Sequence, residues 1–183
     1  MKKLYIVLFL ITVTTLVYSQ SRHYKPNSQS EENVYQIIDK NIWPNDVREN
    51  IEIYKNNLIG WTGIIEKAIV LDENGEDYWI IELFVRHHYY DWIEDFGIGN
   101  KPIRLSPDGE GYFICYSFIS RNADIEKVTI ETIGDFVINY GRPVMVKENA
   151  IILSTEYLRH ISKVYVNTNW LNYYRNWEIR PSE

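Results

Sequence analysis

The chain has 183 residues, with 19 basic and 25 acidic side chains and a net charge of −6 at pH 7. Proteins that bind nucleic acid or anionic lipid usually carry a basic surface, so the negative net charge argues against both partners. The single cysteine, Cys115, excludes an internal disulfide, so a hydrophobic core has to stabilise the fold.

Residues 1–19 have the three parts of a secretory signal peptide. Lys2 and Lys3 supply a positive start, residues 4–18 form an apolar run, and Ser19 is a small residue at the predicted cleavage site. The run is shorter than the roughly 20 residues that a membrane-spanning helix needs, although an uncleaved anchor is the alternative. We expect export across the inner membrane to the periplasm, the cell envelope or the exterior, with no transmembrane span after signal cleavage.

Polar residues then lead into two predicted helices. Residues 20–30 carry few apolar side chains, which predicts a flexible leader. Residues 31–57 form a helical N-terminal segment, because apolar residues recur there at helical spacing. Ser30 is the expected cap of the first helix. Trp43 is expected to end that helix, since the residue before a proline avoids helical geometry.

From residue 58 onward, runs of β-branched and aromatic residues predict strands. Residues 58–90 form a predicted hairpin, because the pair Asn74 and Gly75 is a strong hairpin-turn signal between two such runs. Residues 91–108 form a long connection, and this length favours a binding loop or a covering flap. Cys115 lies within the next apolar run, which predicts a buried and inert thiol.

The remaining strands complete a mainly β domain over residues 58–183. Further strands are predicted at residues 112–119, 128–140 (interrupted by Gly134), 144–146 and 150–153, with turns at 141–143 and 147–149. Residues 154–167 fit either a helix or a last strand, and the aromatic tail at 170–177 could cover a barrel end. Five or six strands with internal glycines favour a small OB-like barrel with short N-terminal helices, and a β-sandwich is the alternative.

Four short motifs in the strand region resemble a known family. Residues 61–65 (Trp-Thr-Gly-Ile-Ile), 80–83 (Ile-Ile-Glu-Leu), 111–113 (Gly-Tyr-Phe) and 134–141 (Gly-Asp-Phe-Val-Ile-Asn-Tyr-Gly) are similar, in this order, to strands of the starvation-inducible (Slp-like) outer-membrane lipoproteins. The resemblance implies an OB-like barrel in the cell envelope and implies nothing about catalysis. The chain departs from that family in having no lipobox cysteine and in having Thr62 where the family has glycine.

One stretch stands out as a candidate ligand-binding site, and it consists of His87, His88, Tyr89, Tyr90, Asp91 and Trp92. Neighbouring residues of a strand point to opposite faces, so the two histidines cannot reach one metal ion together, and no metal site is predicted. We expect both histidines to face solvent at the end of a strand. The carboxylates at positions 91, 94 and 95 could instead serve a glycosidase, which needs two carboxylates at a set separation.

The aromatic content suggests a binding role. Six tryptophans and fifteen tyrosines exceed what a small core requires, and exposed rings with polar neighbours can stack on sugars or contact a protein. We therefore favour a non-enzymatic binding or structural module with an envelope protein or glycan as partner and no cofactor. The alternative is a small hydrolase acting on an envelope glycan or peptide polymer.

Overall fold

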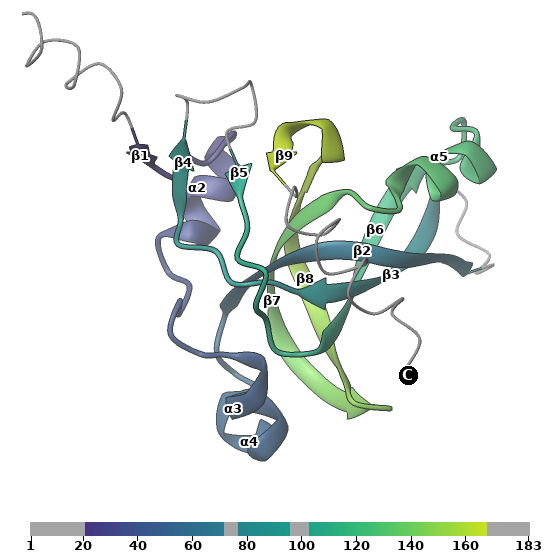
Figure 1. Ribbon diagram of the computed structural model, residues 1–183. Coiled ribbons are helices and arrows are strands. Elements are labelled where there is room, and N and C mark those ends of the chain that lie inside the picture. Colours follow the sequence, from purple (N-terminus) through teal and green to yellow (C-terminus); the bar gives the residue numbers. More distant parts are fainter. Residues whose placement is uncertain (1–20, 72–76, 96–102, 168–183) are drawn as a thin grey trace, which may run out of the picture.

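The computed structural model describes residues 21–71, 77–95 and 103–167, and these residues form a closed β-barrel with short helices around it (Figure 1). The barrel strands follow one another in the order β2 (Ile59–Leu71), β3 (Tyr78–His87), β6 (Tyr112–Ser120), β8 (Ala150–Ile161) and β7 (Phe136–Lys147). All neighbours are antiparallel except β6 and β8, which run parallel. The predicted mainly β barrel with short helices is therefore confirmed.

The predicted hairpin is formed by β2 and β3, whose register runs from Gly63 opposite His87 to Leu71 opposite Ile80. The residues of its turn signal lie outside the described residues. Gly63 permits close strand contact, because a Cβ atom there would lie 2.2 Å from the carbonyl oxygen of Arg86. A register shift between Ile65 and Lys67 marks a bulge that bends β2 around the barrel.

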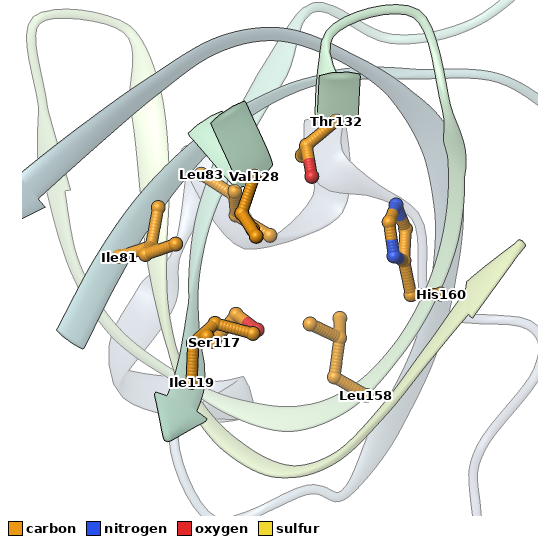
Figure 2. Close-up of a pocket in the computed structure, with 8 residues that line it drawn as sticks. All are labelled: Ile81, Leu83, Ser117, Ile119, Val128, Thr132, Leu158 and His160. Carbon is orange, nitrogen blue, oxygen red and sulfur yellow. The ribbon is translucent and has the colours of Figure 1, made fainter. Parts of the chain in front are cut away.

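The predicted strand at residues 128–140 is wrong in its first half, which is the helix α5 (Ile125–Thr132). Asp124 caps this helix by accepting a hydrogen bond from the backbone N–H of Lys127 (3.2 Å). Gly134, with a φ of +87°, then turns the chain into β7. As a result, Val128 and Thr132 face the end of the barrel instead of extending a strand (Figure 2).

The turn predicted at residues 141–143 is also wrong, because β7 continues through it to Lys147. Register shifts on both sides of this segment let Pro143 remain in the strand. The turn predicted at residues 147–149 does reverse the chain into β8, and Glu148 and Asn149 both have positive φ there. Residues 154–161, which fitted either a helix or a strand, belong to β8.

The N-terminal part is more ordered than predicted. The leader contains β1 (Ser21–His23), which joins a small sheet in the order β1, β4, β5, β9, where the other three strands are β4 (Ile93–Asp95), β5 (Ile103–Arg104) and β9 (Val166–Asn167). The helices are α2 (Gln29–Tyr35), α3 (Pro44–Glu49), α4 (Ile51–Tyr54) and the short 3-10 helix η1 (Lys163–Tyr165). Ser28, and not Ser30, caps α2, while Pro44 begins α3 as its first residue.

Two hydrophobic cores lie on opposite sides of the barrel wall. Alternate residues of β7 show this division, because Val137 belongs to the inner core whereas Ile138 and Tyr140 belong to the outer core. The inner core contains Trp61, Phe113 and the buried Cys115, whose pKa is raised by burial, as the predicted inert thiol requires. None of the helices in the described ranges is long and apolar enough to cross a membrane.

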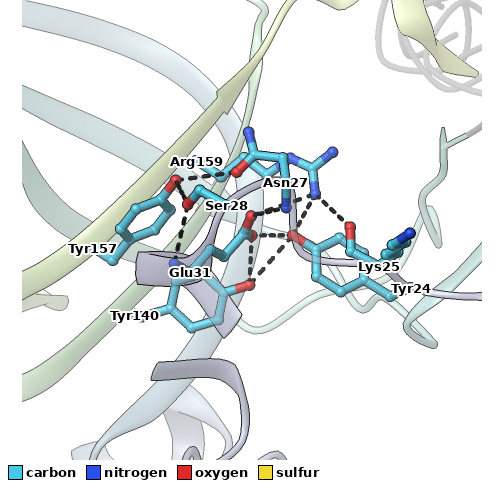
Figure 3. Close-up of polar contacts among 8 residues, drawn as sticks. All are labelled: Tyr24, Lys25, Asn27, Ser28, Glu31, Tyr140, Tyr157 and Arg159. Atoms are coloured by element: carbon cyan, nitrogen blue, oxygen red, sulfur yellow. Dashed lines mark hydrogen bonds and ion pairs between the residues drawn. The ribbon is translucent and has the colours of Figure 1, made fainter. Parts of the chain in front are cut away.

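The outer core attaches the N-terminal segment to the barrel. Tyr24 is buried against β7 and β8, so the predicted flexible leader is wrong at this residue. The carboxylate of Glu31 in α2 is fully buried and accepts a hydrogen bond from the hydroxyl of Tyr140 (2.9 Å) and one from the hydroxyl of Tyr24 (Figure 3). Arg159 of β8 lies 3.6 Å from the same carboxylate. This network joins α2 to the outer surface of β7 and β8.

Candidate functional site

An open groove of about 430 Å³ brings together part of the predicted ligand-binding stretch. We call it the aromatic groove, and it is lined by Trp43, Tyr89, Tyr90, Asp91, Leu105 and Ser106. The residues come from three places: the connection before α3, the segment after β3 and the segment after β5. A pocket of a few hundred Å³ that mixes apolar rings with a few polar groups is typical of ligand sites.

Trp43 and Tyr89 are the two half-buried rings of the groove. Their ring centroids lie 5.0 Å apart with planes at 84°, an edge-to-face arrangement that holds both rings in place. The position of Trp43 is fixed further by α3, because its backbone N–H donates to the carboxylate of Asp46 (2.8 Å). The rings are therefore presented in a fixed geometry by a helix start and a strand end.

The hydroxyl end of Tyr89 is held by Glu110. The phenol donates to Oε1 of Glu110, and the other carboxylate oxygen accepts from the backbone N–H of Asn45 (2.7 Å). Desolvation by burial, followed by this hydrogen bond, raises the pKa of Tyr89 to about 12. Tyr89 consequently stays neutral at physiological pH and keeps its bond to Glu110.

The floor and rim of the groove differ in polarity. Tyr90 and Leu105 are buried, with 5 % of their surface exposed, and they form an apolar floor. Asp91 is exposed at the rim, beside the hydroxyl-bearing Ser106. The backbone joins the two sides, because the N–H of Ser106 donates to the carbonyl of Tyr89 (3.1 Å).

Both histidines of the predicted site lie beneath the surface, so the expectation that they face solvent is wrong. His87 and His88 each have only 1 % of their surface exposed. Nδ1 of His87 accepts from the backbone N–H of Glu110 (3.0 Å), and Nδ1 of His88 lies 3.1 Å from the carbonyl oxygen of Ser106. Desolvation by burial lowers the pKa of His87 to about 3 and that of His88 to about 4. The ring of His87 packs edge-on against the groove residues Trp43 (centroids 6.1 Å apart) and Tyr89 (5.2 Å), whereas His88 lines a different pocket. Both rings are uncharged at neutral pH.

These buried histidines predict that the protein loses stability as the pH falls below about 6.5. An unfolded histidine takes up a proton near pH 6.5, whereas folded His87 does not until about pH 3, so the unfolded state binds more protons in between. Each such group weakens folding by up to about 1.4 kcal/mol per pH unit in this window. Urea unfolding at pH 7, 6 and 5 measures the slope. His87→Asn, whose amide oxygen can still accept from Glu110, should flatten it.

The matched control for this titration is Trp43→Phe, which alters the ring above His87 and removes no titrating group. Trp43→Phe should lower stability equally at each pH and leave the slope unchanged. Equal slopes in the wild type and in His87→Asn would contradict a neutral buried His87.

Trp92, the last residue of the predicted stretch, does not line the groove. Its ring packs against Tyr24 (centroids 5.3 Å apart) and Tyr35 (5.4 Å) in the outer core. Its φ of +57° is unusual for a bulky residue, and its ring also contacts the buried ring of Tyr90 (centroids 5.6 Å apart). Trp92 therefore helps to hold α2 and β1 to the barrel.

Of the carboxylates that the hydrolase alternative uses, the structure describes only the side chain of Asp91, and this side chain is not paired with either histidine in the described residues. Asp91 is exposed, and its nearest predicted partners His87 and His88 are buried with backbone groups as their hydrogen-bond partners. The side chains of positions 94 and 95 lie outside the described residues. Among the residues that the structure describes, no group of three or more His, Cys, Asp or Glu could hold a metal ion.

Sequence reasoning missed Trp43 as a residue of the groove, whereas Leu105 and Ser106 belong to the 91–108 connection that was predicted as a binding loop or a covering flap. Trp43 lies more than forty positions before Tyr89, and its role as a helix boundary gave no sign of a ligand contact. The available signal was its residue type, because tryptophan combines a large apolar ring with a polar N–H group and is enriched at binding surfaces. Comparison of the chain with protein-family models, with curated proteins and with solved structures gives no match.

Proposed function

We propose that this chain is an exported, non-enzymatic binding module of the cell envelope, and that its aromatic groove binds a neutral glycan. The observation that carries the proposal is the pair of fixed, half-buried rings of Trp43 and Tyr89 above an apolar floor, with the carboxylate of Asp91 at the rim. Sugar rings offer apolar faces that stack on aromatic side chains, and they offer hydroxyl groups that donate to carboxylates.

An OB-type barrel is part of this proposal. Supporting it are the five-stranded closure, the parallel pairing of β6 with β8 that completes it, and the helix α5 between β6 and β7. Such barrels bind oligonucleotides or oligosaccharides, and the net charge of −6 favours the uncharged ligand. The Slp-like resemblance is proposed on the same basis, because its four motifs lie in order on β2, β3, the start of β6 and β7.

The groove predicts saturable binding of neutral oligosaccharides that depends on Trp43. Titration of the chain from residue 20 onward with chitohexaose, cellohexaose and maltohexaose, followed by calorimetry, should show binding to at least one of them. Trp43→Ala should weaken that binding roughly tenfold or more, because a stacking ring at a site centre is the type of residue that dominates affinity.

Trp79→Ala is the matched control, since Trp79 is another half-buried tryptophan on β3, stacked by Arg121 and outside the groove. Its affinity should equal that of the wild type. Thermal melting of both variants confirms that they are folded. If none of the three oligosaccharides binds, or if Trp43→Ala binds as well as Trp79→Ala, the glycan groove is refuted.

Export predicts a processed N-terminus. In fractionated host cells, mass spectrometry should find the protein outside the cytoplasm with Gln20 as its first residue, because Ser19 precedes the predicted cleavage site. If the full-length chain, with residues 1–19 still attached, were found in the cytosol, this result would contradict the envelope role.

A further inference from the structure

A small cavity lies inside the end of the barrel that α5 covers. It has a volume of about 60 Å³, and aliphatic side chains form most of its wall: Ile81 and Leu83 of β3, Ile119 of β6, Leu158 of β8 and Val128 of α5. Figure 2 shows these side chains directed toward one common space. The cavity shares no lining residue with the aromatic groove, so it is an independent feature of the molecule.

The cavity adjoins an open pocket of about 480 Å³ at the surface. Val128, Thr132 and His160 line both spaces, so the inner cavity and the outer pocket are neighbours across these three side chains. The inner wall also contains one serine, Ser117, whose hydroxyl lies among the aliphatic groups (Figure 2). An apolar chamber with a few polar groups at its mouth is the usual form of a small-molecule site.

His160 is held in a fixed orientation at this mouth. Its Nε2 lies 2.9 Å from Oδ2 of Asp135, a residue with only 6 % of its surface exposed. The other oxygen of Asp135 accepts from the backbone N–H of Lys163 (2.8 Å). Because a carboxylate oxygen accepts, Nε2 carries the proton in this pair, and Nδ1 is the ring atom left for a ligand.

The roof of the pocket is fastened by Lys163. Its ammonium group donates to the carbonyl oxygens of Glu131 (3.1 Å) and Ile133 (2.9 Å) at the C-terminal end of α5. Cations stabilise helix C-termini, so this contact holds α5 over the cavity. The chamber is therefore a feature of the assembled fold, with walls from three strands and a helix.

Size and charge select the ligand. The inner cavity is well below the roughly 150 Å³ that accommodates benzene, so it admits a short or branched aliphatic group and no aromatic ring. Glu131 is paired with Lys127 (3.8 Å) and Asp135 with His160, and the ammonium of Lys163 donates to two carbonyl oxygens. A carboxylate ligand would therefore lose its hydration without gaining a cation of its own. A neutral polar group can instead hydrogen bond to His160 and to the hydroxyl of Ser162.

We propose that this barrel end binds small neutral amphiphiles, in which a short branched aliphatic group enters the cavity and an amide or hydroxyl group contacts His160. Isobutyramide is the probe, isobutyrate is its charged analogue of the same shape, and benzamide is its larger aromatic analogue. In NMR titrations, isobutyramide should give saturable shifts at His160 and Leu158, with a dissociation constant in the range of roughly millimolar expected for so small a ligand. Isobutyrate and benzamide should bind at least tenfold more weakly.

Two pairs of variants test the position of the site. Ser117→Leu fills the cavity and should weaken isobutyramide binding at least tenfold, whereas Ser120→Leu, at an exposed serine of the same strand, should not. His160→Ala should weaken binding, while Trp43→Ala in the aromatic groove should leave it unchanged. If Ser117→Leu does not fold, Leu158→Phe replaces it as the filling variant.

Several results would overturn the proposal. They are the absence of saturable shifts, equal binding of isobutyrate and isobutyramide, and undiminished binding by the filling variant. A crystal grown with isobutyramide that shows only water in the cavity would do the same. None of these results bears on the glycan groove, because the two sites are titrated with different ligands.

Discussion

Glu31→Ala should lower the free energy of unfolding by about 3–5 kcal/mol, the usual cost of breaking a buried charge pair by removing one partner. The fully buried carboxylate accepts from the Tyr140 hydroxyl (2.9 Å) and from the backbone N–H of Asn27 (2.7 Å). The same carboxylate accepts a hydrogen bond from the hydroxyl of Tyr24. It also lies 3.6 Å from the guanidinium of Arg159, whose side chain is largely buried. Alanine would leave these donors and this cation without their shared acceptor. Urea unfolding at pH 7 measures the loss.

Glu32→Ala is the matched control for Glu31→Ala. Glu32 is the next residue of α2, and its carboxylate accepts only from the exposed amide of Gln36 (2.7 Å) among the side chains described. Its replacement should change stability by no more than about 0.5 kcal/mol. Glu31→Gln keeps one acceptor oxygen and should fall between the two. Similar losses for Glu31→Ala and Glu32→Ala would show that the network contributes nothing to folding.

A gain in stability is expected at Asn139, because Asn139→Leu should raise the free energy of unfolding by about 1–3 kcal/mol. Asn139 is fully buried, and neither its amide nitrogen nor its amide oxygen has a hydrogen-bond partner among the described residues. It lies on β7 opposite Trp61 on one side and Leu158 on the other, on the inward-facing register of Val137. Leucine has a similar shape and removes two polar atoms from an apolar core.

Asn33→Leu is the control for this substitution, because Asn33 is exposed on α2 and the same exchange buries nothing there. Its stability should stay within about 0.5 kcal/mol of the wild type. Thermal and urea unfolding of both variants give the comparison. A loss of stability in Asn139→Leu would contradict the prediction.

The barrel could be predicted in outline because its strands carry a local signal. Along β3, Ile81, Leu83 and Val85 alternate with less buried residues, and this period of two is visible in the sequence. The α5 segment could not be assigned in the same way. Val128 and Ile130 are β-branched and favour strands locally, yet the Asp124 cap and packing of Val128 against the barrel end select a helix.

The candidate site was predictable only in part. Tyr89, Tyr90 and Asp91 were chosen from one short stretch, and they do meet in the aromatic groove. Trp43 joins them from a distant part of the chain, and periodicity carries no information about such a contact. His87 was expected to face solvent at the end of a strand, and its burial follows from the rings of Trp43 and Trp61, which pack edge-on against it from other elements.

The sequence by itself determined the mainly β character, the β2–β3 hairpin and the aromatic stretch after β3, since each depends on residues adjacent in the chain. Tertiary structure alone decided which faces are buried, where Glu31 and Asn139 lie, and which residues share a groove or a cavity. The physical reason is that barrel closure brings distant segments together. Desolvation then sets the protonation state and the hydrogen bonding of each buried polar group. The extent of desolvation depends on how all the neighbouring residues pack.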